Sequence, residues 1–501
     1  MKLIFLCSAL LWGNTVSAQV VEPRTNMPAV RYGSSLVDEH SMSRFKFVYE
    51  LDSIPSDLPL PNVTVLKTTG EGYIFAAVPY WGQGTSYLAI YDNAGRPVAY
   101  KKVSSACTDF KLQRNGLLTY YDYEARKYFV LDSALHPIES YAAQHGFSTD
   151  EHDIQFLENG NVLLIGYDIR QYDMSRIVDS GSANADVIVN VVQEIDPYKR
   201  VVFEWKAYEH YQFADVGPAV NLRDQSFRFT HINSVDLDRD GGLIVSARHL
   251  NEISKIDRTT GAFIWRLGGK KNQFTFIGDS AGFSGQHSAR VLPNGNLLIF
   301  DNGVSRIPAF SRAVEYHLDT IRMTAECVWS YRASPDIASE FWGNAQRLGN
   351  GNTFISWGHA SVAATEVDQA GQTVFEMSFP SNVFSYRIFR YPFKRLTTGS
   401  AEPLLAFPSE FSIKQNYPNP FNPSTTLEFS LPCESQVTLR IYDMLGRKVE
   451  SLANGRYAAG VHQVRWNAGV PSGVYVYRFE AVRTANPSRH FVGTGKMQLI
   501  R

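Results

Sequence analysis

The chain has 501 residues, of which 19% are charged and 13% are aromatic, and its formal net charge at pH 7 is −1. This length allows two or three domains, and the composition is typical of a globular β protein rather than a disordered one. Lysine and arginine do not gather in a long run, which argues against a nucleic-acid partner.

The N-terminus has the parts of a secretory signal peptide. Lys2 precedes a short apolar stretch, and Val16 and Ala18 place small residues at positions −3 and −1 of a cleavage site. We therefore predict that residues 1–18 are removed on export. The apolar stretch is too short to span a bilayer, so we expect no stable membrane insertion. Residues 19–60 are expected to form an N-terminal extension.

A paired pattern recurs through residues 61–395. Its first half is an apolar run, a turn containing Asn-Gly or Asp-Gly, and a second apolar run, which favours a β-hairpin because the turn needs positive φ. Copies of it occupy residues 110–120, 154–165, 235–245, 289–299 and 345–355, with a degenerate copy at 68–76. The second half, a strand, an Asp, a turn and another strand, occupies residues 88–100, 128–141, 192–205, 253–265, 314–329 and 364–375.

Six units of four strands predict an all-β fold, a six-bladed β-propeller over residues 61–395. The alternative is two unrelated β-sandwiches, which the repetition disfavours. The interval between the third and fourth turns is the longest. Residues 170–230 are therefore expected to include an inserted loop that caps one mouth of the channel.

A linker at 396–412 leads to a different module at 413–501. Period-two alternation and Gly, Pro and Asn turns predict a small C-terminal β-sandwich. Its motifs, such as Tyr417-Pro-Asn-Pro-Phe-Asn-Pro423 and Val437-Thr-Leu-Arg-Ile-Tyr-Asp443, resemble the type A sorting domain of the type IX secretion system of Bacteroidota. The resemblance implies the type IX machinery as a partner and export through the periplasm to a secreted or cell-surface location. An ordinary carbohydrate-binding or Fn3-like domain is the alternative.

Polar residues recur at equivalent places in the repeats. The start of the inner strand carries His152, His231, His287 and Asn344, and the end of the next strand carries Asp168, Arg248 with His249, residues 301–306 and His359. Residues at equivalent places in successive blades face one axis, so these side chains predict a cationic pocket suited to an oxyanion. A metal site is the competing interpretation, but short-range ligand spacing and zinc-type Cys patterns are absent. We predict no metal and no cofactor.

These residues belong to motifs that resemble the bacterial arylsulfate sulfotransferase family over roughly residues 60–395. The motifs are His231-Ile-Asn-Ser-Val-Asp236, Ser246-Ala-Arg-His-Leu-Asn251, Ile256-Asp-Arg-Thr-Thr-Gly-Ala-Phe-Ile-Trp-Arg-Leu-Gly-Gly269, Gln286-His-Ser-Ala-Arg-Val-Leu-Pro-Asn-Gly-Asn296, Phe300-Asp-Asn-Gly303, Ser311-Arg-Ala-Val-Glu-Tyr316 and Gly349-Asn-Gly-Asn-Thr-Phe-Ile-Ser-Trp-Gly358. The resemblance implies a six-bladed propeller and a PAPS-independent enzyme. Such an enzyme moves a sulfuryl group from a phenolic sulfate donor to a phenol acceptor through a sulfohistidine.

The resemblance also implies roles for individual residues. His231 and His287 correspond to the two inner-strand histidines, Arg306 to the family's arginine with Arg312 as the second choice, and His359 to the sulfated histidine. Family members with a small polar residue two places after the second histidine have Asn at that position, and this chain has Ala289 there. Trp81 and Trp342 could stack on aryl groups, although propeller packing would explain both.

Two other functions stay open at this point. A non-catalytic secreted propeller that binds glycans or proteins would keep the channel histidines without using them, and a hydrolase would use water as acceptor. Within the main domain, Cys107 and Cys327 are the only possible disulfide pair after signal removal, and the sequence does not decide whether they bond.

Overall fold

The computed structural model describes residues 54–79, 86–381, 383–392, 411–431, 435–457, 460–483 and 490–500. The chain divides into two compact units, residues 1–399 and 400–501. The predicted signal peptide, most of the N-terminal extension and of the linker, and the side chains of Trp81 and Cys433 lie outside the described residues. No helix within the described ranges is long and apolar enough to cross a membrane.

The described part of the first unit is almost entirely β structure, arranged in six mainly antiparallel sheets. The first two sheets are β2 (Tyr73–Val78), β3 (Ser86–Tyr91) and β4 (Pro97–Val103) with β27 (Ile388–Tyr391), and β5 (Cys107–Leu112), β6 (Leu118–Asp122), β7 (Lys127–Leu131) and β8 (Pro137–Tyr141). The third and fourth are β9 (Ser148–Phe156), β10 (Val162–Tyr172), β11 (Ala185–Ile195), β12 (Val201–Lys206) and β13 (Ser226–Arg228), and β14 (Ile232–Leu237), β15 (Leu243–Ala247), β16 (Glu252–Ile256) and β17 (Phe263–Gly268).

The fifth and sixth sheets each have five strands. They are β18 (Thr275–Ile277), β19 (His287–Val291), β20 (Leu297–Asp301), β21 (Arg312–Asp319) and β22 (Thr324–Arg332), and β1 (Asn62–Val65), β23 (Asn344–Arg347), β24 (Thr353–Ser356), β25 (Ala364–Val367) and β26 (Thr373–Ser378). The described helices are single turns, namely η1 (Met174–Arg176), α2 (Ala207–His210), η2 (Phe213–Asp215) and η3 (Arg248–Leu250).

The edge strands of the six sheets contact one another in a cycle. β5 contacts β9, β9 contacts β14, β14 contacts β19, β19 contacts β23, β23 contacts β27, and β27 contacts β5. Neighbouring sheets share apolar cores. In one of these cores, Ile244 and Leu267 of the fourth sheet pack with Ile299 and Tyr316 of the fifth. Each sheet therefore presents one edge strand to its two neighbours.

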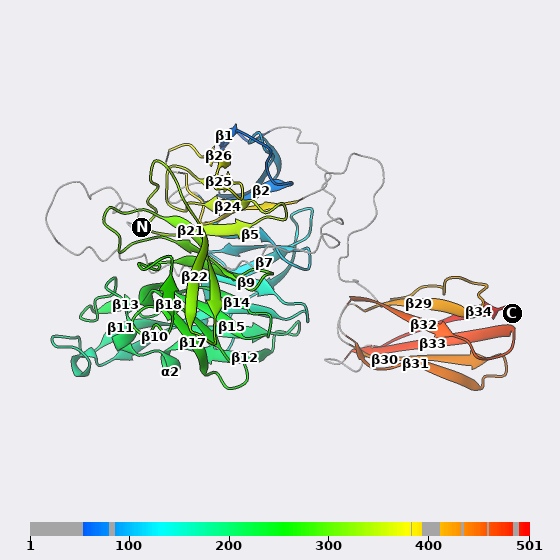
Figure 1. Cartoon of the computed structure of the whole chain (residues 1–501). Coiled ribbons are helices and arrows are strands. Elements are labelled where there is room, and N and C mark those ends of the chain that lie inside the picture. The colour runs from blue at the N-terminus through cyan, green and yellow to red at the C-terminus, as the bar shows by residue number, and fades with distance from the viewer. Residues whose placement is uncertain are drawn as a thin grey trace. The chain divides into compact units, whose positions relative to one another are not determined.

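The first sheet differs from the prediction. The expected hairpin at residues 68–76 does not form, because β1 pairs with β26 and β2 pairs with β27. Figure 1 shows blue β1 beside yellow β26, although about 310 residues separate them along the chain. A strand from the C-terminal end of the unit thus completes the first sheet.

The fold decides the state of the two cysteines and shows which elements residues 170–230 form, while the capping of a channel mouth by this segment stays a prediction. Cys107 and Cys327 are both free thiols, so the disulfide that the sequence left open is not formed. The long interval at residues 170–230 contains η1, α2, η2 and β13 as well as regular strands, and β13 pairs in parallel with β11.

The second unit consists of two sheets in its described part. One contains β28 (Ser412–Ile413), β29 (Ser424–Leu431) and β32 (Gly460–Asn467), and the other contains β30 (Ser435–Asp443), β31 (Lys448–Tyr457), β33 (Gly473–Arg483) and β34 (His490–Leu499). One apolar core joins the two sheets through residues such as Leu427, Trp466, Leu439 and Phe479.

Candidate functional site

Inner-strand starts from different sheets supply the polar residues of the candidate site. His152 lies on β9, His231 immediately precedes β14, His287 begins β19, and Arg387 immediately precedes β27. β14 and β19 carry a break in strand register here, and His231 has φ +50°, a left-handed conformation that non-glycine residues rarely adopt. Such bulges redirect a side chain and are common next to functional sites.

Three of the histidines form a row that ends on a carboxylate. His249 Nδ1 donates to the carbonyl oxygen of Arg228 at 2.8 Å, and His249 Nε2 lies 3.2 Å from His231 Nδ1. His231 Nε2 lies 3.2 Å from His152 Nε2, and His152 Nδ1 lies 2.9 Å from Asp150 Oδ1. All of these side chains except that of His249 are buried. The row is therefore a continuous set of hydrogen-bonding contacts through three imidazoles.

His287 contacts Asn302, which directly follows β20. Its Nδ1 lies 2.7 Å from Asn302 Oδ1, and the Asn302 amide donates to the carbonyl oxygens of Ser339 and Trp342 at 2.8 and 3.0 Å. Because Asn302 uses its amide as donor, its oxygen must accept, so His287 Nδ1 carries a proton. Because Nδ1 carries the proton of the neutral ring, His287 Nε2 keeps a lone pair and is an acceptor.

Three arginines surround the histidines with positive charge. Arg228 ends β13, Arg248 begins η3 and donates to the carbonyl oxygen of Glu340, and Arg387 donates to the carbonyl oxygen of Asn233. All three arginines are at least nine-tenths buried. Buried guanidinium groups near imidazoles form a site that favours an anion.

Burial and these cations keep the imidazoles neutral. Burial is the largest cause that lowers the pKa of His152, His231 and His287 well below the ordinary value, and it lowers the pKa of His249 to about 3. The charges of the arginines lower these pKa values further. A neutral imidazole retains a lone pair, so the site can act as a nucleophile or a base at neutral pH.

His359 lies apart from the histidine row and is exposed. Its ring packs 4.2 Å from that of Phe384 and 5.7 Å from that of Trp342, measured between centroids. Trp342 in turn contacts Tyr386, whose ring lies 5.7 Å from that of His152. Partial burial against these rings lowers the pKa of His359. Aromatic rings thus connect His359 to the row without a hydrogen bond in the described residues.

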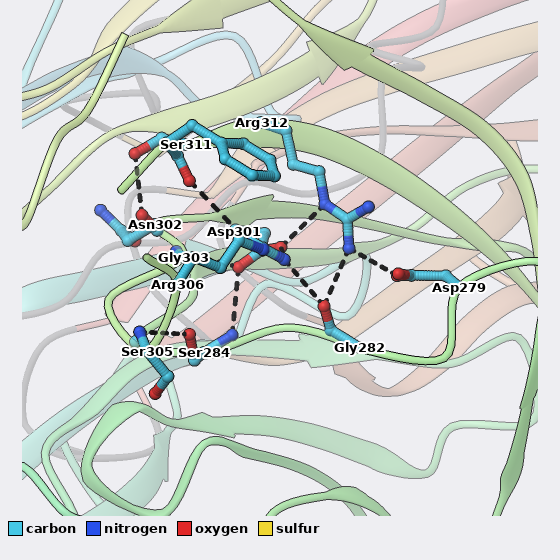
Figure 2. A network of polar contacts seen from close by, with 12 residues as sticks. Asp279, Gly282, Ser284, Asp301, Asn302, Gly303, Ser305, Arg306, Ser311 and Arg312 are labelled. Atoms are coloured by element: carbon cyan, nitrogen blue, oxygen red, sulfur yellow. Dashed lines mark hydrogen bonds and ion pairs between the residues drawn. The ribbon is translucent and has the colours of Figure 1, made fainter. Parts of the chain in front are cut away.

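Arg306 and Arg312 belong to an ion-pair network next to Asn302. Both guanidinium groups bond to Asp301 and to the carbonyl oxygen of Gly282, as Figure 2 shows. Arg312 also bonds to Asp279. The network holds the turn that carries Asn302. Neither arginine contacts a histidine of the site within the described residues.

A second ionic cluster lies wholly inside the protein on neighbouring inner strands. Lys111 Nζ lies 2.5 Å from Asp109 and 3.5 Å from Asp153, and Arg290 lies 3.5 Å from Asp153. Burial raises the pKa of Asp109 and lowers the pKa of Lys111. These charges join β5, β9 and β19, and their side chains are closed to solvent, so we assign them a structural role.

The sequence identified part of this site. Of the four residues that it selected, His231 and His287 lie at equivalent inner positions, while His359 and Arg306 lie outside the row. Ala289 is buried in the apolar core, so it supplies no polar contact. The residues that the sequence did not select are Asp150, His152, Arg228, Arg248, His249, Asn302 and Arg387. His152, Arg248 and His249 were visible as recurring polar positions, but nothing in the repeat pattern indicated Arg228 or Arg387.

Comparisons with known proteins agree with the sequence motifs. A family model described as Arylsulfotransferase (ASST) matches residues 115–380, and a model of the secretion system C-terminal sorting domain matches residues 415–492. No curated protein matches the chain significantly. The sorting-domain match indicates an exported protein that uses this secretion machinery.

Solved structures resemble the chain only distantly. A protein of unknown function from Bacteroides caccae has 12% identity and a TM-score of 0.41, and the match covers 64% of this chain and 98% of that one. A virginiamycin B lyase from Staphylococcus aureus with quinupristin has 8% identity and a TM-score of 0.34, over 65% and 89% of the two chains. A gluconolactonase from Xanthomonas campestris has 12% identity and a TM-score of 0.34, over 65% and 97%.

Proposed function

This chain belongs to the arylsulfotransferase (ASST) family, and from that premise we propose that it transfers a sulfuryl group from a phenolic sulfate ester to a phenol. The observation that carries the proposal is the histidine row with His287, set among Arg228, Arg248 and Arg387. Neutral imidazoles supply nucleophile and base, and the guanidinium groups favour an anionic sulfate. The route needs no nucleotide donor.

The proposed chemistry has two balanced steps. An imidazole nitrogen attacks the sulfur of the donor, an N–S bond forms, the S–O bond to the aryl group breaks, and a phenolate departs. The oxygen of the acceptor phenol then attacks the same sulfur as it loses its proton, and the N–S bond breaks. Preorganised positive charge around the sulfuryl oxygens lowers both barriers, and removal of one such donor costs about 10²–10³ in turnover.

We propose His359 as the histidine that becomes sulfated. No hydrogen bond to its ring nitrogens is found in the part of the chain that the structure describes, and its lowered pKa favours the neutral, nucleophilic form. Its neighbour Trp342 accepts a hydrogen bond from Asn302, the partner of His287. The aromatic rings of Trp342 and Phe384 can hold an aryl group beside it.

The other predicted residues receive roles in the same proposal. His287 Nε2 accepts a hydrogen bond from the hydroxyl of the acceptor phenol and helps to place its oxygen, and His231 orients its neighbours in the row, while the sulfuryl oxygens face the guanidinium groups. Arg306 acts indirectly, because its bonds to Asp301 and Gly282 hold the turn that carries Asn302. The sequence suggested Arg306 as the source of positive charge. In this proposal, Arg248 and Arg387 supply that charge instead.

The fold that we propose for this chemistry is a six-bladed β-propeller followed by a C-terminal β-sandwich. The cyclic contacts from β5 through β9, β14, β19, β23 and β27 support the propeller, and the two sheets around one apolar core support the sandwich. We further propose that the tail directs passage from the periplasm across the outer membrane by the type IX system.

The test is covalent labelling of the full mature chain. Brief exposure to 4-nitrophenyl sulfate should add the mass of one sulfuryl group, and phenol should then remove the adduct and release phenyl sulfate. A His359→Ala variant should form no adduct, while the exposed His136→Ala serves as the matched control. Absence of an adduct and of phenol-dependent 4-nitrophenol release would favour the non-catalytic binding protein. A rate of 4-nitrophenol release that does not depend on phenol would indicate hydrolysis.

A further inference from the structure

The hydrogen bonds of the histidine row determine where its protons lie. His249 Nδ1 faces the carbonyl oxygen of Arg228, which only accepts, so this nitrogen carries the proton. His249 is neutral because its pKa is lowered to about 3, so its Nε2 is an acceptor. His231 Nδ1 must therefore donate to it, and the other nitrogen of a neutral His231, Nε2, is an acceptor.

At the Asp150 end of the row, two acceptors face each other. His152 Nε2 must donate to His231 Nε2, so in a neutral His152 the remaining nitrogen, Nδ1, has a lone pair. This lone pair faces Asp150 Oδ1 at 2.9 Å, and a carboxylate is also only an acceptor. With these tautomers, the contact is a hydrogen bond only if one additional proton lies between the two groups. It is held either as an imidazolium on His152 or as a carboxylic acid on Asp150.

The surroundings hold this proton weakly on both groups. Burial and the cationic arginines disfavour an imidazolium at His152. The Asn190 amide donates to Asp150 Oδ2 at 3.1 Å, and Arg228 lies 3.9 Å away, and both favour the ionised carboxylate. The charged and titratable groups that face the pair are Arg228, Arg248, Arg387, His231, His287, Glu151, Tyr121, Tyr167 and Tyr386.

We propose that Asp150 and His152 form the proton-transfer pair of this site, an inference that rests on the proposed function and assigns two residues that it did not include. The pair stores one proton, gives it to the departing phenolate and recovers it from the acceptor phenol. Without substrate, His231, which His249 orients, accepts the His152 Nε2–H, and the aryl oxygen replaces His231 as its acceptor when the donor is cleaved.

Both proton steps balance. When the donor is cleaved, His152 Nε2–H passes its proton to the phenolate oxygen while Nδ1 takes the proton of Asp150, which leaves a carboxylate and a neutral imidazole. When the acceptor enters, its O–H proton moves to His152 Nε2 and the Nδ1 proton returns to Asp150. One turnover therefore restores the starting state, and no other co-reactant is required.

The test compares leaving groups in an Asp150→Asn variant. The introduced side-chain amide can donate to His152 Nδ1, so the row stays intact but stores no extra proton. Phenyl sulfate has a basic leaving group that needs the proton, and its kcat/KM should fall about 10²–10⁴-fold. 4-Nitrophenyl sulfate releases a delocalised anion, and its kcat/KM should fall less than about tenfold. Equal losses for both donors would mean a structural role and would overturn the proposal.

The matched control and a second measurement keep the two hypotheses separate. Asp179→Asn removes an exposed carboxylate from the turn that follows η1 and should change the kcat/KM of neither donor. Nitrogen-15 NMR of histidine-labelled full chain should find His152 protonated at Nε2, with its Nδ1 signal displaced toward the protonated position, and Asp150→Asn should abolish this displacement. If the wild-type protein shows these signals but has no transferase activity, the proposed sulfuryl transfer is refuted and the Asp150–His152 pair is not. An unprotonated His152 Nε2 would refute the pair.

Discussion

At the scale of single residues, the site depends on imidazoles that folding deprives of water. His231 and His287 are almost completely buried, and His249 donates a proton to a backbone carbonyl. Imidazole nitrogens in such surroundings keep their lone pairs, which is what nucleophilic and base chemistry requires. Because these imidazoles resist protonation in the folded state, the free energy of unfolding should depend on pH in the acidic range.

We predict that stability falls as the pH is lowered through the ordinary histidine range. In the unfolded chain these imidazoles bind protons below about pH 6.5, whereas the folded protein holds their pKa values far lower, so protons favour unfolding. Each such histidine should reduce the unfolding free energy by about 1.4 kcal/mol between pH 7.5 and 5.5. Denaturant unfolding of His249→Gln should show a shallower pH dependence than wild type, and exposed His136→Gln should not. An unchanged slope for His249→Gln would contradict the assignment.

At the scale of elements, the pairing of β2 with β27 brings two distant parts of the chain into one sheet. Tyr73 pairs with Tyr391, and Arg387 directly precedes the last strand. Gly72 lies at the start of this pairing with φ +114°, and a Cβ on it would lie 1.8 Å from the carbonyl oxygen of Tyr391. The close approach of these two backbones therefore requires glycine.

We predict that Gly72→Ala disturbs this pairing and with it the position of Arg387. The strained φ and the backbone clash should cost about 2–4 kcal/mol of unfolding free energy, and turnover should fall because a cation of the site moves. Gly349→Ala is the matched control, since a Cβ there meets nothing within 4 Å. Equal stability of the two variants, measured by denaturant titration, would argue against the observed pairing of β2 with β27.

At the scale of the whole molecule, the chemistry and the export address belong to separate units. Every residue of the candidate site lies in the unit of residues 1–399, and the sorting-domain match lies in the unit of residues 400–501. Each unit has its own apolar core. Two compact units with separate cores are expected to fold independently.

We predict that a chain ending at Gly399 keeps the fold and the transferase activity but is no longer exported. The unfolding free energy of the first unit should change by less than about 0.5 kcal/mol, because none of the described residues after 399 belongs to the apolar clusters of that unit. Secretion is measured in cells that carry the sorting machinery, with the full chain for comparison. A chain ending at residue 381, which lacks β27, should unfold, and a stable, active product from it would contradict the role of that strand.

The local pattern of the chain was sufficient for its β class, for its repeated hairpins, for the C-terminal module and for the placement of His231 and His287 at the starts of inner strands. These features follow from short-range rules, because alternation and Asn-Gly turns are set by neighbouring residues. Only the tertiary structure decided that β27 completes the first sheet, that Cys107 and Cys327 stay unpaired, and that Asp150, Arg228 and Arg387 join the site. These outcomes depend on which distant strand edges meet and on burial, which raises or lowers a pKa only after the surrounding charges are in place.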